Sequence, residues 1–494
     1  MRVTIRSLIC IVLSCDALID VSRSYAVIES DRPPPDDRQF VSPIVDATIA
    51  NISSRMRDPL LARIFSNCLP NSLDTTILSS NQENPSTFVI TGDIHAMWLR
   101  DSTNQVLPYL RFANHDLKLR KMLCGVIQQQ AEQVLEDPYS NAFNQFPSGG
   151  GHRHDVRYPP LKHIVFEGKY ELDSLASVLK LASSYYAATK DHTCFLLNDK
   201  RVLRAVEIIL KTIIAEQESS ADNVSVASYI FQRKTEVATD TLMLQGRGAP
   251  GKKCGLSKSY FRPSDDSNTF PFSIPSNAFA SVELHRIALT LKAVYPGDDL
   301  AAGLSLKSSN LAEELSDAIM EHGVQDGHFV YEIDGLGNSI FMDDANVPSL
   351  LSFPYIGFTS TNNSLYRATR AKVLSSANAY YFSGREGSGV GGPHVGMDQI
   401  WPMAIIIQAL TSVDDKEITE CLEILRNTTA DTYFMHESFD CENAKSFTRP
   451  WFAWANSMFG ELILMLAEHR PHLIFVAPIG DDDYLIRSPI QPLE

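Results

Sequence analysis

The sequence predicts a mainly α-helical fold, a barrel of helical hairpins whose connecting loops build a concave site at one end. The first observation is a recurring stripe of apolar residues three and four positions apart, the pattern of a helix that buries one face. The second is that only 87–90 and 328–333 have a strand-like pattern, which does not support a large sheet. The third is that long polar loops with glycine and proline separate the stripes, and such loops gather functional residues.

Eleven segments carry the helical pattern. The clearest is 199–217, where Val202, Val206, Ile209 and Ile213 fall on one face. The predicted helices span 43–67, 104–112, 115–136, 171–189, 199–217, 276–294, 308–322, 363–375, 399–411, 415–426 and 452–468. The loops between them span 91–103, 144–169, 228–275, 334–357, 379–398 and 430–451.

The composition is that of a globular, enzyme-sized protein. The 494 residues are 44% hydrophobic and 21% charged, which excludes a largely disordered chain. The net charge is -16 without a basic run, so a polyanion such as nucleic acid would be repelled. No stretch after the N-terminus reaches the ~18 apolar residues that a membrane span needs, and we expect no stable membrane insertion.

The N-terminus has the pattern of a secretory signal. Arg2 and Arg6 precede the apolar run 8–13, and small residues follow near 24–26. Asp16 and Asp20 leave a buried N-terminal helix as the alternative. The predicted organisation is a signal peptide at 1–25, a flexible proline-rich leader at 26–42, a catalytic domain at 43–475 and a C-terminal tail at 476–494.

Glycosylation sequons and scattered cysteines also point to the secretory pathway, either outside the cell or in the Golgi lumen. Asn-x-Ser/Thr triplets occur at Asn51, Asn223, Asn362 and Asn427. Six cysteines follow the signal, which permits long-range disulfides, and the two closest in sequence are Cys421 and Cys441. No CxxC pair or Cys/His spacing marks a zinc site, and we expect no cofactor.

The motif TGDIHAMWLRDS at 91–102 places an indole, a guanidinium and a carboxylate within four residues. Trp98 offers a stacking face, while Arg100 donates and Asp101 accepts hydrogen bonds, which suits an uncharged sugar. The structural alternative is a buried Arg–Asp pair that caps the next helix.

Two pairs of adjacent aspartates are further candidates. Asp265 and Asp266 follow Arg262 in FRPSDDSNTF. Neighbouring carboxyls raise each other's pKa when partly buried, as a general acid requires. Asp343, Asp344 and Asn346, in FMDDANVPSLL, form a second such cluster. Each cluster has a helix or turn cap as its alternative role.

A glutamate among aromatic residues is the candidate general base. Glu437 follows His436 in FMHESFD, and a carboxylate framed in this way can polarise water. The segment RPWFAWAN supplies Arg449, Trp451 and Trp454 as possible pocket walls. The alternative is a solvated loop glutamate, which leaves the aromatic neighbours unexplained.

Other polar residues are candidates for binding the sugar. They include Arg262, Asp343, Asp344, Asn346 and His436 from the motifs above. Glu171 and Asp173 lie in FEGKYELDS, where they also suit the cap of the following helix, and His394 ends a glycine-rich stretch. The chain contains no GxSxG nucleophile elbow and no HExxH zinc motif.

Taken together, these motifs resemble glycoside hydrolase family 125, the exo-α-1,6-mannosidases. The likeness runs from about residue 45 to 470 and includes EIDGLGNSIFMDDANVPSLLSFPYIG and FTRPWFAWANSMFGELI. It implies an (α/α)6 barrel, an inverting mechanism without an essential metal, and release of terminal mannose from α-1,6-linked mannosides. It also implies Glu437 as the general base and either Asp265 or Asp266 as the general acid, with Asp265 preferred, and a sugar-holding role for Arg100 and Asp101.

The expected reaction uses two carboxyl groups on opposite sides of the scissile bond. One aspartic acid protonates the glycosidic oxygen while Glu437 takes a proton from the attacking water. Room for that water requires carboxyls roughly 6.5 to 9.5 Å apart. The competing functions are another helical-barrel glycosidase, of the α-glucosidase or trehalase type, and a catalytically inactive sugar-binding protein.

Overall fold

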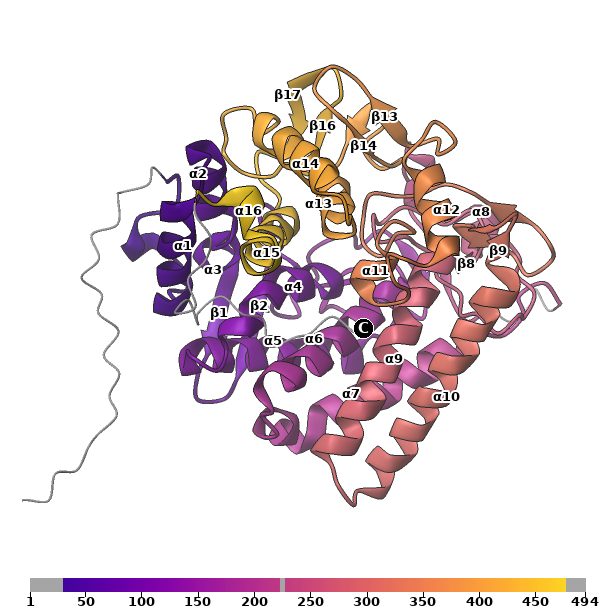
Figure 1. Ribbon diagram of the computed structural model, residues 1–494. Helices are drawn as coiled ribbons and strands as arrows, with labels where there is room; N and C mark the ends of the chain where they lie inside the picture. The colour runs from indigo at the N-terminus through magenta and orange to yellow at the C-terminus, as the bar shows by residue number, and fades with distance from the viewer. Residues whose placement is uncertain (1–29, 223–226, 477–494) are drawn as a thin grey trace, which may run out of the picture.

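The computed structural model describes residues 30–222 and 227–476, and the described chain is mainly helical, as predicted (Figure 1). The expected signal peptide, and all but residue 476 of the expected tail, lie outside these residues. No helix within the described ranges has the length and apolar character needed to cross a membrane.

Six inner helices form a continuous series of contacts. Contacts run from α13 to α15, α4, α6, α9 and α11 in that order. Nearly every residue of α4 and most of α15 are buried, as expected of helices enclosed by others. The six are α4 (Leu99–Val106), α6 (Leu172–Thr189), α9 (Ile274–Val294), α11 (Phe353–Ile356), α13 (Pro402–Leu410) and α15 (Ala453–His469).

A layer of outer helices alternates with the inner ones along the chain. Each inner helix from α4 to α13 is followed by an outer helix, and the pair α9 and α10 lies side by side as a long hairpin (Figure 1). This alternation is what a barrel of helical hairpins requires. The outer helices are α1 (Pro43–Arg55), α2 (Pro59–Cys68), α5 (Leu117–Glu136), α7 (Thr193–Ala215), α10 (Asp299–His322), α12 (Ser364–Val373) and α14 (Asp415–Asn427). The backbone of α7 is non-helical at 197–200.

The remaining elements are short. Single helical turns occur at α3 (Asn71–Thr75), α8 (Met243–Gly246), α16 (Pro471–Ile474), η1 (Pro35–Asp37), η2 (Leu107–Phe112) and η3 (Ala238–Asp240). Two-stranded antiparallel sheets pair β1 (Ile77–Asn81) with β2 (Ser86–Val89), β5 (Val156–Tyr158) with β7 (Ile230–Gln232), β9 (Val324–Gln325) with β10 (His328–Phe329), and β13 (Tyr381–Ser383) with β14 (Ser388–Val390).

Three small antiparallel sheets lie in the connections that lead into the inner helices. Strand β3 runs directly into α4, β8 into α9, and β15 ends just before α13. These sheets therefore hold the chain rigidly where the inner helices begin. They are β3 (Met97–Trp98), β4 (Ala142–Phe143) and β6 (Val165–Glu167); β8 (Phe272–Ser273), β11 (Glu332–Ile333) and β12 (Ser339–Ile340); and β15 (Gln399–Ile400), β16 (Ser438–Asp440) and β17 (Asn443–Thr448).

Three predicted helix boundaries were wrong. The helix expected from residue 308 begins at Asp299, where the Asp298 carboxylate accepts a hydrogen bond from Ala301 N. The segment 43–67 is two helices, because the Asp58 carboxylate accepts hydrogen bonds from Leu60 N and Leu61 N and starts a new helix at Pro59. The helix expected from residue 104 begins at Leu99, so Arg100 and Asp101 lie in its first turn and not in a loop.

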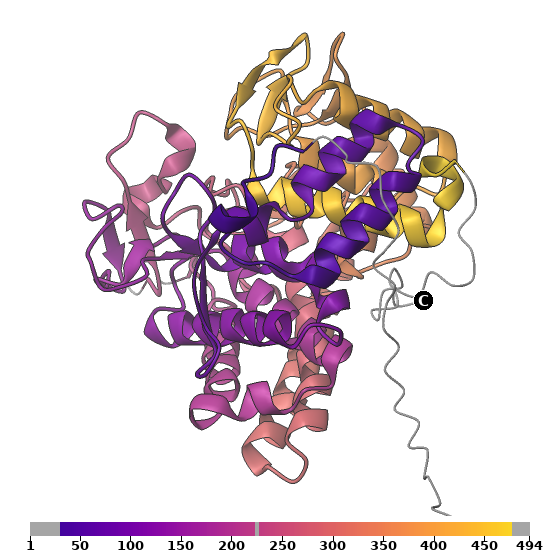
Figure 2. The ribbon, with the colours of Figure 1, turned by 90° about the vertical axis from the view of Figure 1, so that its left-hand side faces the viewer.

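Part of the expected flexible leader contacts the domain. The Arg32 guanidinium meets Asp74 at 2.7 Å and Asp46 at 2.8 Å, and Phe40 is only 3% exposed. The two ends of the described chain also meet, since Met56 and Phe475 form a β-bridge and α2 packs against α15 (Figure 2). Residues 30–42 are thus part of the packed structure.

One disulfide links two outer helices. Cys124 on α5 is bonded to Cys194 on α7, 70 residues later in the chain. Cys421 and Cys441, the candidates closest in sequence, are both unbonded.

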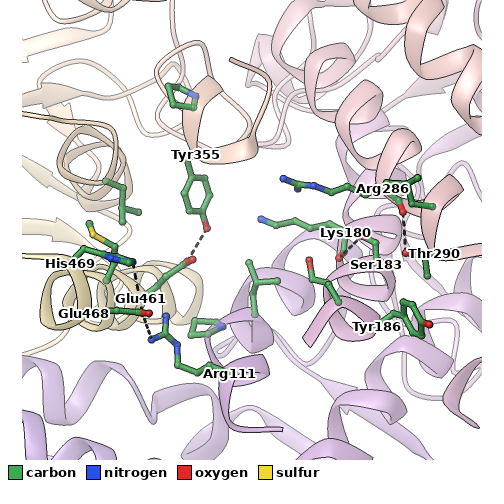
Figure 3. Close-up of a pocket in the computed structure, with 18 of the residues that line it drawn as sticks. Arg111, Lys180, Ser183, Tyr186, Arg286, Thr290, Tyr355, Glu461, Glu468 and His469 are labelled. Atoms are coloured by element: carbon green, nitrogen blue, oxygen red, sulfur yellow. Dashed lines mark hydrogen bonds and ion pairs between the residues drawn. The ribbon is translucent and has the colours of Figure 1, made fainter. Parts of the chain in front are cut away.

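A cavity of about 790 Å³ lies where the inner helices end. Every inner segment contributes to it: Arg111 from η2, which continues α4, Lys180 from α6, Arg286 from α9, Tyr355 from α11, Leu410 from α13 and Glu461 from α15 (Figure 3). The six inner helices therefore surround a common space. The opposite end of that space, where the helices begin, contains the predicted site.

Candidate active site

A second, much smaller pocket lies at the N-terminal ends of the inner helices. Its volume is about 60 Å³, yet it collects most of the predicted chemistry. Among its lining residues are Trp98, Arg100, Asp101, Asp265, Asn346, His394, Trp401, Glu437, Arg449, Phe452 and Trp454. Volume alone would favour the other cavity, but carboxyl groups that face one another are what hydrolysis requires.

Arg100 is the centre of a buried cluster of carboxyl groups beneath this pocket. Its Nη1 meets Glu171 at 2.5 Å and Asp173 at 3.3 Å, while Nη2 meets Asp265 at 3.2 Å and Asp101 at 3.4 Å. Arg100 is 3% exposed, so one buried guanidinium contacts four carboxyl groups. Burial raises the pKa of Asp101 and of Asp173 to about 6 in each case.

Asp265 and Asp266 have different surroundings. Asp265 has a left-handed backbone conformation, with φ at 67°, and its side chain lines the pocket. Asp266 is 2% exposed and turns toward Ser264 and His394, whose Nδ1 lies 3.3 Å from Oδ1. Burial disfavours the imidazolium, but Asp266 opposes this and raises the pKa of His394 to about 9.

Glu437 lines the same pocket as Asp265 and precedes β16. Its carboxylate meets Arg449 Nε at 3.1 Å, and Arg449 Nη1 also contacts Asp93 at 2.5 Å. Arg449 has a left-handed φ of 55°, an uncommon conformation for a non-glycine residue. The ion pair fixes the orientation of Glu437 toward the pocket.

Aromatic side chains supply the apolar faces of the pocket. Within the described chain, the buried indole N–H groups of Trp98, Trp401 and Trp454 have no hydrogen-bond acceptor. Buried donors of this kind are costly when unpaired, and sugar hydroxyls would satisfy them. Trp401 and Phe452 were not among the predicted site residues, although Trp401 was visible as a tryptophan beside a glycine-rich loop.

Several predicted site residues lie behind the pocket and hold its walls. Glu171 and Asp173 are fully buried and contact Arg100 from the start of α6. Arg262 is ion-paired at 2.8 Å with the buried Glu332. His436 is buried, with its ring nitrogens facing the carbonyls of Arg449 and Thr429. None of these predicted residues, nor Trp451, lines the small pocket in the described structure.

The second aspartate pair and Trp451 also hold other parts of the protein in place. The Asp343 carboxylate accepts hydrogen bonds from Leu350 N and Leu351 N, which is the turn-capping alternative. Asp344 accepts from Ser264 Oγ at 2.9 Å and from Asn346 Nδ2 at 3.1 Å, and so supports the loop of the first aspartate pair. The ring of Trp451 packs over Gly92, where an added Cβ would lie 2.8 Å from it.

Two supporting residues were not anticipated. The amide of Asn141 contacts Glu167, Glu171 and Asp265 at 3.0, 3.1 and 3.2 Å. Lys169 Nζ donates to the backbone carbonyl of Asp265 at 2.7 Å. Asn141 belongs to no cluster with a recognisable chemical pattern in the sequence, whereas Lys169 lies within FEGKYELDS, where only the acidic residues were candidates. In residues 30–222 and 227–476, no group of three or more His, Cys, Asp and Glu side chains is arranged to hold a metal ion.

A helical assembly with paired carboxyls and tryptophans at one end defines a glycosidase of the helical-barrel class. The family model for metal-independent α-mannosidases, glycoside hydrolase family 125, matches residues 58–464. The chain belongs to this family, which confirms the resemblance seen in the motifs.

Relatives support the assignment over nearly the whole chain. The chain is 45% identical over 462 residues to the meiotically up-regulated gene 157 protein of Schizosaccharomyces pombe, covering 90% of this chain and 89% of that protein. A Streptococcus pneumoniae metal-independent α-mannosidase, solved in a non-productive complex with α-1,6-mannobiose, matches with a TM-score of 0.81 and 36% identity. That match covers 87% of this chain and 100% of the other.

A more distant structure shares the fold alone. The family 78 rhamnosidase of Bacillus sp. matches with a TM-score of 0.50 and 12% identity, over 83% of this chain and 35% of the other.

Proposed function

We propose that this α-mannosidase removes terminal non-reducing mannose from α-1,6-linked mannosides, with inversion at the anomeric carbon. The observation that carries the proposal is that Asp265 and Glu437 line one pocket. They come from loops that precede α9 and α15. These two helices are not neighbours, because α4 and α6 lie between them in the series of inner helices. The α-1,6-mannobiose bound to the S. pneumoniae relative supports the choice of linkage.

In the proposed reaction, Asp265 is the general acid and Glu437 the general base. Asp265 gives a proton to the glycosidic oxygen as the bond to C1 breaks and its electron pair stays with the leaving oxygen. Water attacks C1 from the opposite face and loses a proton to Glu437. Asp266 is the weaker candidate for the acid, because its buried carboxyl is engaged by His394 and Ser264 and does not itself line the pocket.

The terminal sugar is held by the residues of the first motif. Trp98 and Trp454 provide apolar faces with free indole N–H donors, and Asp101 accepts hydrogen bonds from hydroxyls. Asn346 and His394 close the pocket beside them. Holding the ring in this way brings C1 to the water that Glu437 activates.

A panel of disaccharides tests the substrate and separates the alternatives. We expect mannose release from α-1,6-mannobiose, and much slower release from α-1,2- and α-1,3-mannobiose. Release of glucose from α-glucosides or trehalose without mannose release would instead assign the chain to another helical-barrel glycosidase. Binding of mannobiose without any turnover would indicate an inactive sugar-binding protein.

We also propose that the protein enters the secretory pathway, for export or for retention in the Golgi lumen. The disulfide between Cys124 and Cys194 suits an oxidising compartment. The sequon residues Asn362 and Asn427 are exposed, as glycosylation requires. Treatment of protein from its native source with an N-glycan-releasing amidase should lower its apparent mass, whereas an unchanged mass would contradict this route.

A further inference from the structure

The proposed general acid has surroundings that do not favour a proton on it. Burial acts to raise the pKa of Asp265, but Arg100, Lys169 and His394 outweigh it and hold that pKa well below its usual range. A general acid must carry a proton at the operating pH. A neighbouring group that holds the proton and delivers it to Asp265 would meet this requirement.

Glu171 lies beside Asp265. The two carboxyls share two donors: Arg100, through Nη1 and Nη2, and Asn141 Nδ2, at 3.1 and 3.2 Å. Two ionised carboxylates held against the same donors repel one another, so one proton in the pair is favoured.

The oxygens of Glu171 show where that proton lies. Oε2 accepts from Arg100 Nη1 at 2.5 Å and from Ser174 Oγ at 2.7 Å. Among the residues that the structure describes, Oε1 accepts from the Asn141 amide alone, which it shares with Asp265 Oδ1. The proton thus belongs on Oε1, between the two carboxyls.

We infer that Glu171 is the proton store of the general acid. It passes its proton to Asp265 as Asp265 protonates the glycosidic oxygen. This role rests on the proposed function of Asp265 and deepens it. Glu171 lies beneath the pocket without lining it, so it acts through Asp265 as a positioning residue.

Electrostatics within the cluster supports this role. Glu171 is 1% exposed, and burial raises its pKa well above the usual value, with the neighbouring carboxyls adding to the effect. The one guanidinium of Arg100 cannot offset four buried carboxylates. The charged and titratable groups around the pair are Arg100 and Asp101 on α4, Glu167 on β6, Asp173 on α6, Lys169, and His394.

The proton balance closes over one turnover. The Glu171–Asp265 pair loses one proton to the leaving oxygen, and Glu437 gains one from the attacking water. Glu437 lines the pocket and returns its proton to solvent after the products leave. The pair then takes one proton from solvent, which restores the starting state.

Glu171→Gln tests the role directly. The glutamine amide still donates to Asp265 and its carbonyl still accepts from Arg100 and Ser174, but it has no transferable proton. We expect kcat on α-1,6-mannobiose to fall roughly 100-fold or more, in the range of general acid catalysis. On 2,4-dinitrophenyl α-mannoside, whose leaving group needs no proton, kcat should fall less than about threefold.

The pH profile provides a second readout. In Glu171→Gln the basic limb of kcat/KM for mannobiose should move at least about one pH unit lower, because Asp265 alone then holds the proton. Asp173→Asn is the matched control, since Asp173 shares Arg100 but is not bonded to Asn141. It should affect both substrates equally and leave the basic limb unchanged.

The outcomes separate the two proposals. Equal losses on both substrates in Glu171→Gln, or an unmoved basic limb, would overturn the role of Glu171. Asp265→Asn must show the same dependence on the leaving group. If it does not, the assignment of Asp265 fails as well. The melting temperature of each variant shows whether the fold is retained.

Discussion

The two ends of the inner helices differ in chemistry more than in construction. Where the helices begin, carboxyls and tryptophans converge on a pocket of about 60 Å³. Where they end, a cavity of about 790 Å³ is lined by a mixture of apolar and polar side chains, including Lys180 and Arg286, which extend toward Tyr355 and Glu461 (Figure 3). The carboxyl groups among its described lining residues, Glu461 and Glu468, both come from α15, whereas Asp265 and Glu437 come from separate loops.

Helix direction explains part of this difference. Helix N-termini stabilise negative charge, and the first turns of α4 and α6 contain Asp101 and Asp173. Helix C-termini stabilise positive charge, and Arg111 and His469 lie in the last turns of η2 and α15. The ammonium group of Lys180, in the large cavity, is also held by the protein, because its Nζ donates to Asn104 Oδ1 at 3.2 Å. The proposed catalytic carboxyl groups therefore lie at the end of the barrel where helix N-termini stabilise negative charge.

The largest expected effect compares two glutamates at opposite ends. Glu437→Gln removes the proposed base, and kcat on α-1,6-mannobiose should fall roughly 100- to 10,000-fold. Glu461→Gln, in the large cavity, should change kcat less than about twofold, because Glu461 faces Tyr355 and is remote from the reaction. Steady-state kinetics on both variants checks this. A similar loss in both would show that the two ends are not functionally distinct.

Aromatic residues allow the same comparison for substrate binding. Trp98→Ala should lower kcat/KM roughly 10- to 100-fold, because the terminal sugar loses its stacking face and its alignment. Tyr186→Ala, an aromatic truncation in the large cavity, is the control and should leave kcat/KM within about twofold. An unchanged kcat/KM in Trp98→Ala would remove Trp98 from the sugar subsite.

The pH dependence of stability tests the buried carboxyls at the active end. Burial raises the pKa of Asp343 to about 8, whereas in the unfolded chain an aspartate titrates near 4. The folded state therefore binds more protons between these values, so the free energy of unfolding falls as pH rises from about 4 to 8. In Asp343→Asn this contribution disappears. The drop in melting temperature between pH 5.5 and 8.5 should be smaller than in the wild type by about 2 °C or more.

The smallest effect concerns a single hydrogen bond at the large cavity. Tyr355→Phe removes the hydroxyl that donates to Glu461 at 2.9 Å, and should cost about 1 to 2 kcal/mol of unfolding free energy. Because the bond is at the far end, kcat/KM should stay within about twofold of the wild type. Urea denaturation and mannobiose kinetics measure the two quantities. A large loss of activity with little loss of stability would show that the two ends are coupled.

Much of the fold could be predicted from the sequence, because a helix that buries one face has apolar residues three and four positions apart. The bounds of α5, α6 and α9 were predicted to within two residues, since each buries a continuous apolar stripe. The start of α4 was missed because Arg100 and Asp101 are polar, and polar residues inside a buried helix break the pattern. Local sequence also could not show that Glu171 lies against Asp265, since that contact joins segments about 90 residues apart.

The motifs predicted residues that line one pocket, but they did not predict how deeply each residue is buried. Asp343, Arg262 and His436 were predicted as sugar-binding residues, yet each is engaged by buried protein groups. A catalytic Asp or Glu and a supporting one look alike in the sequence. Only their burial and contacts in the folded structure distinguish them. Asn141 gave no signal, because a lone amide in a loop has no chemical partner nearby in the chain.

The central claim is that two carboxyls act on opposite faces of the sugar, with water as the nucleophile. It is tested most directly by NMR of the anomeric protons during hydrolysis of α-1,6-mannobiose, before mutarotation mixes the products. The account predicts that β-mannose appears first. Initial appearance of α-mannose would contradict it, because retention requires a covalent glycosyl-enzyme intermediate in place of direct attack by water.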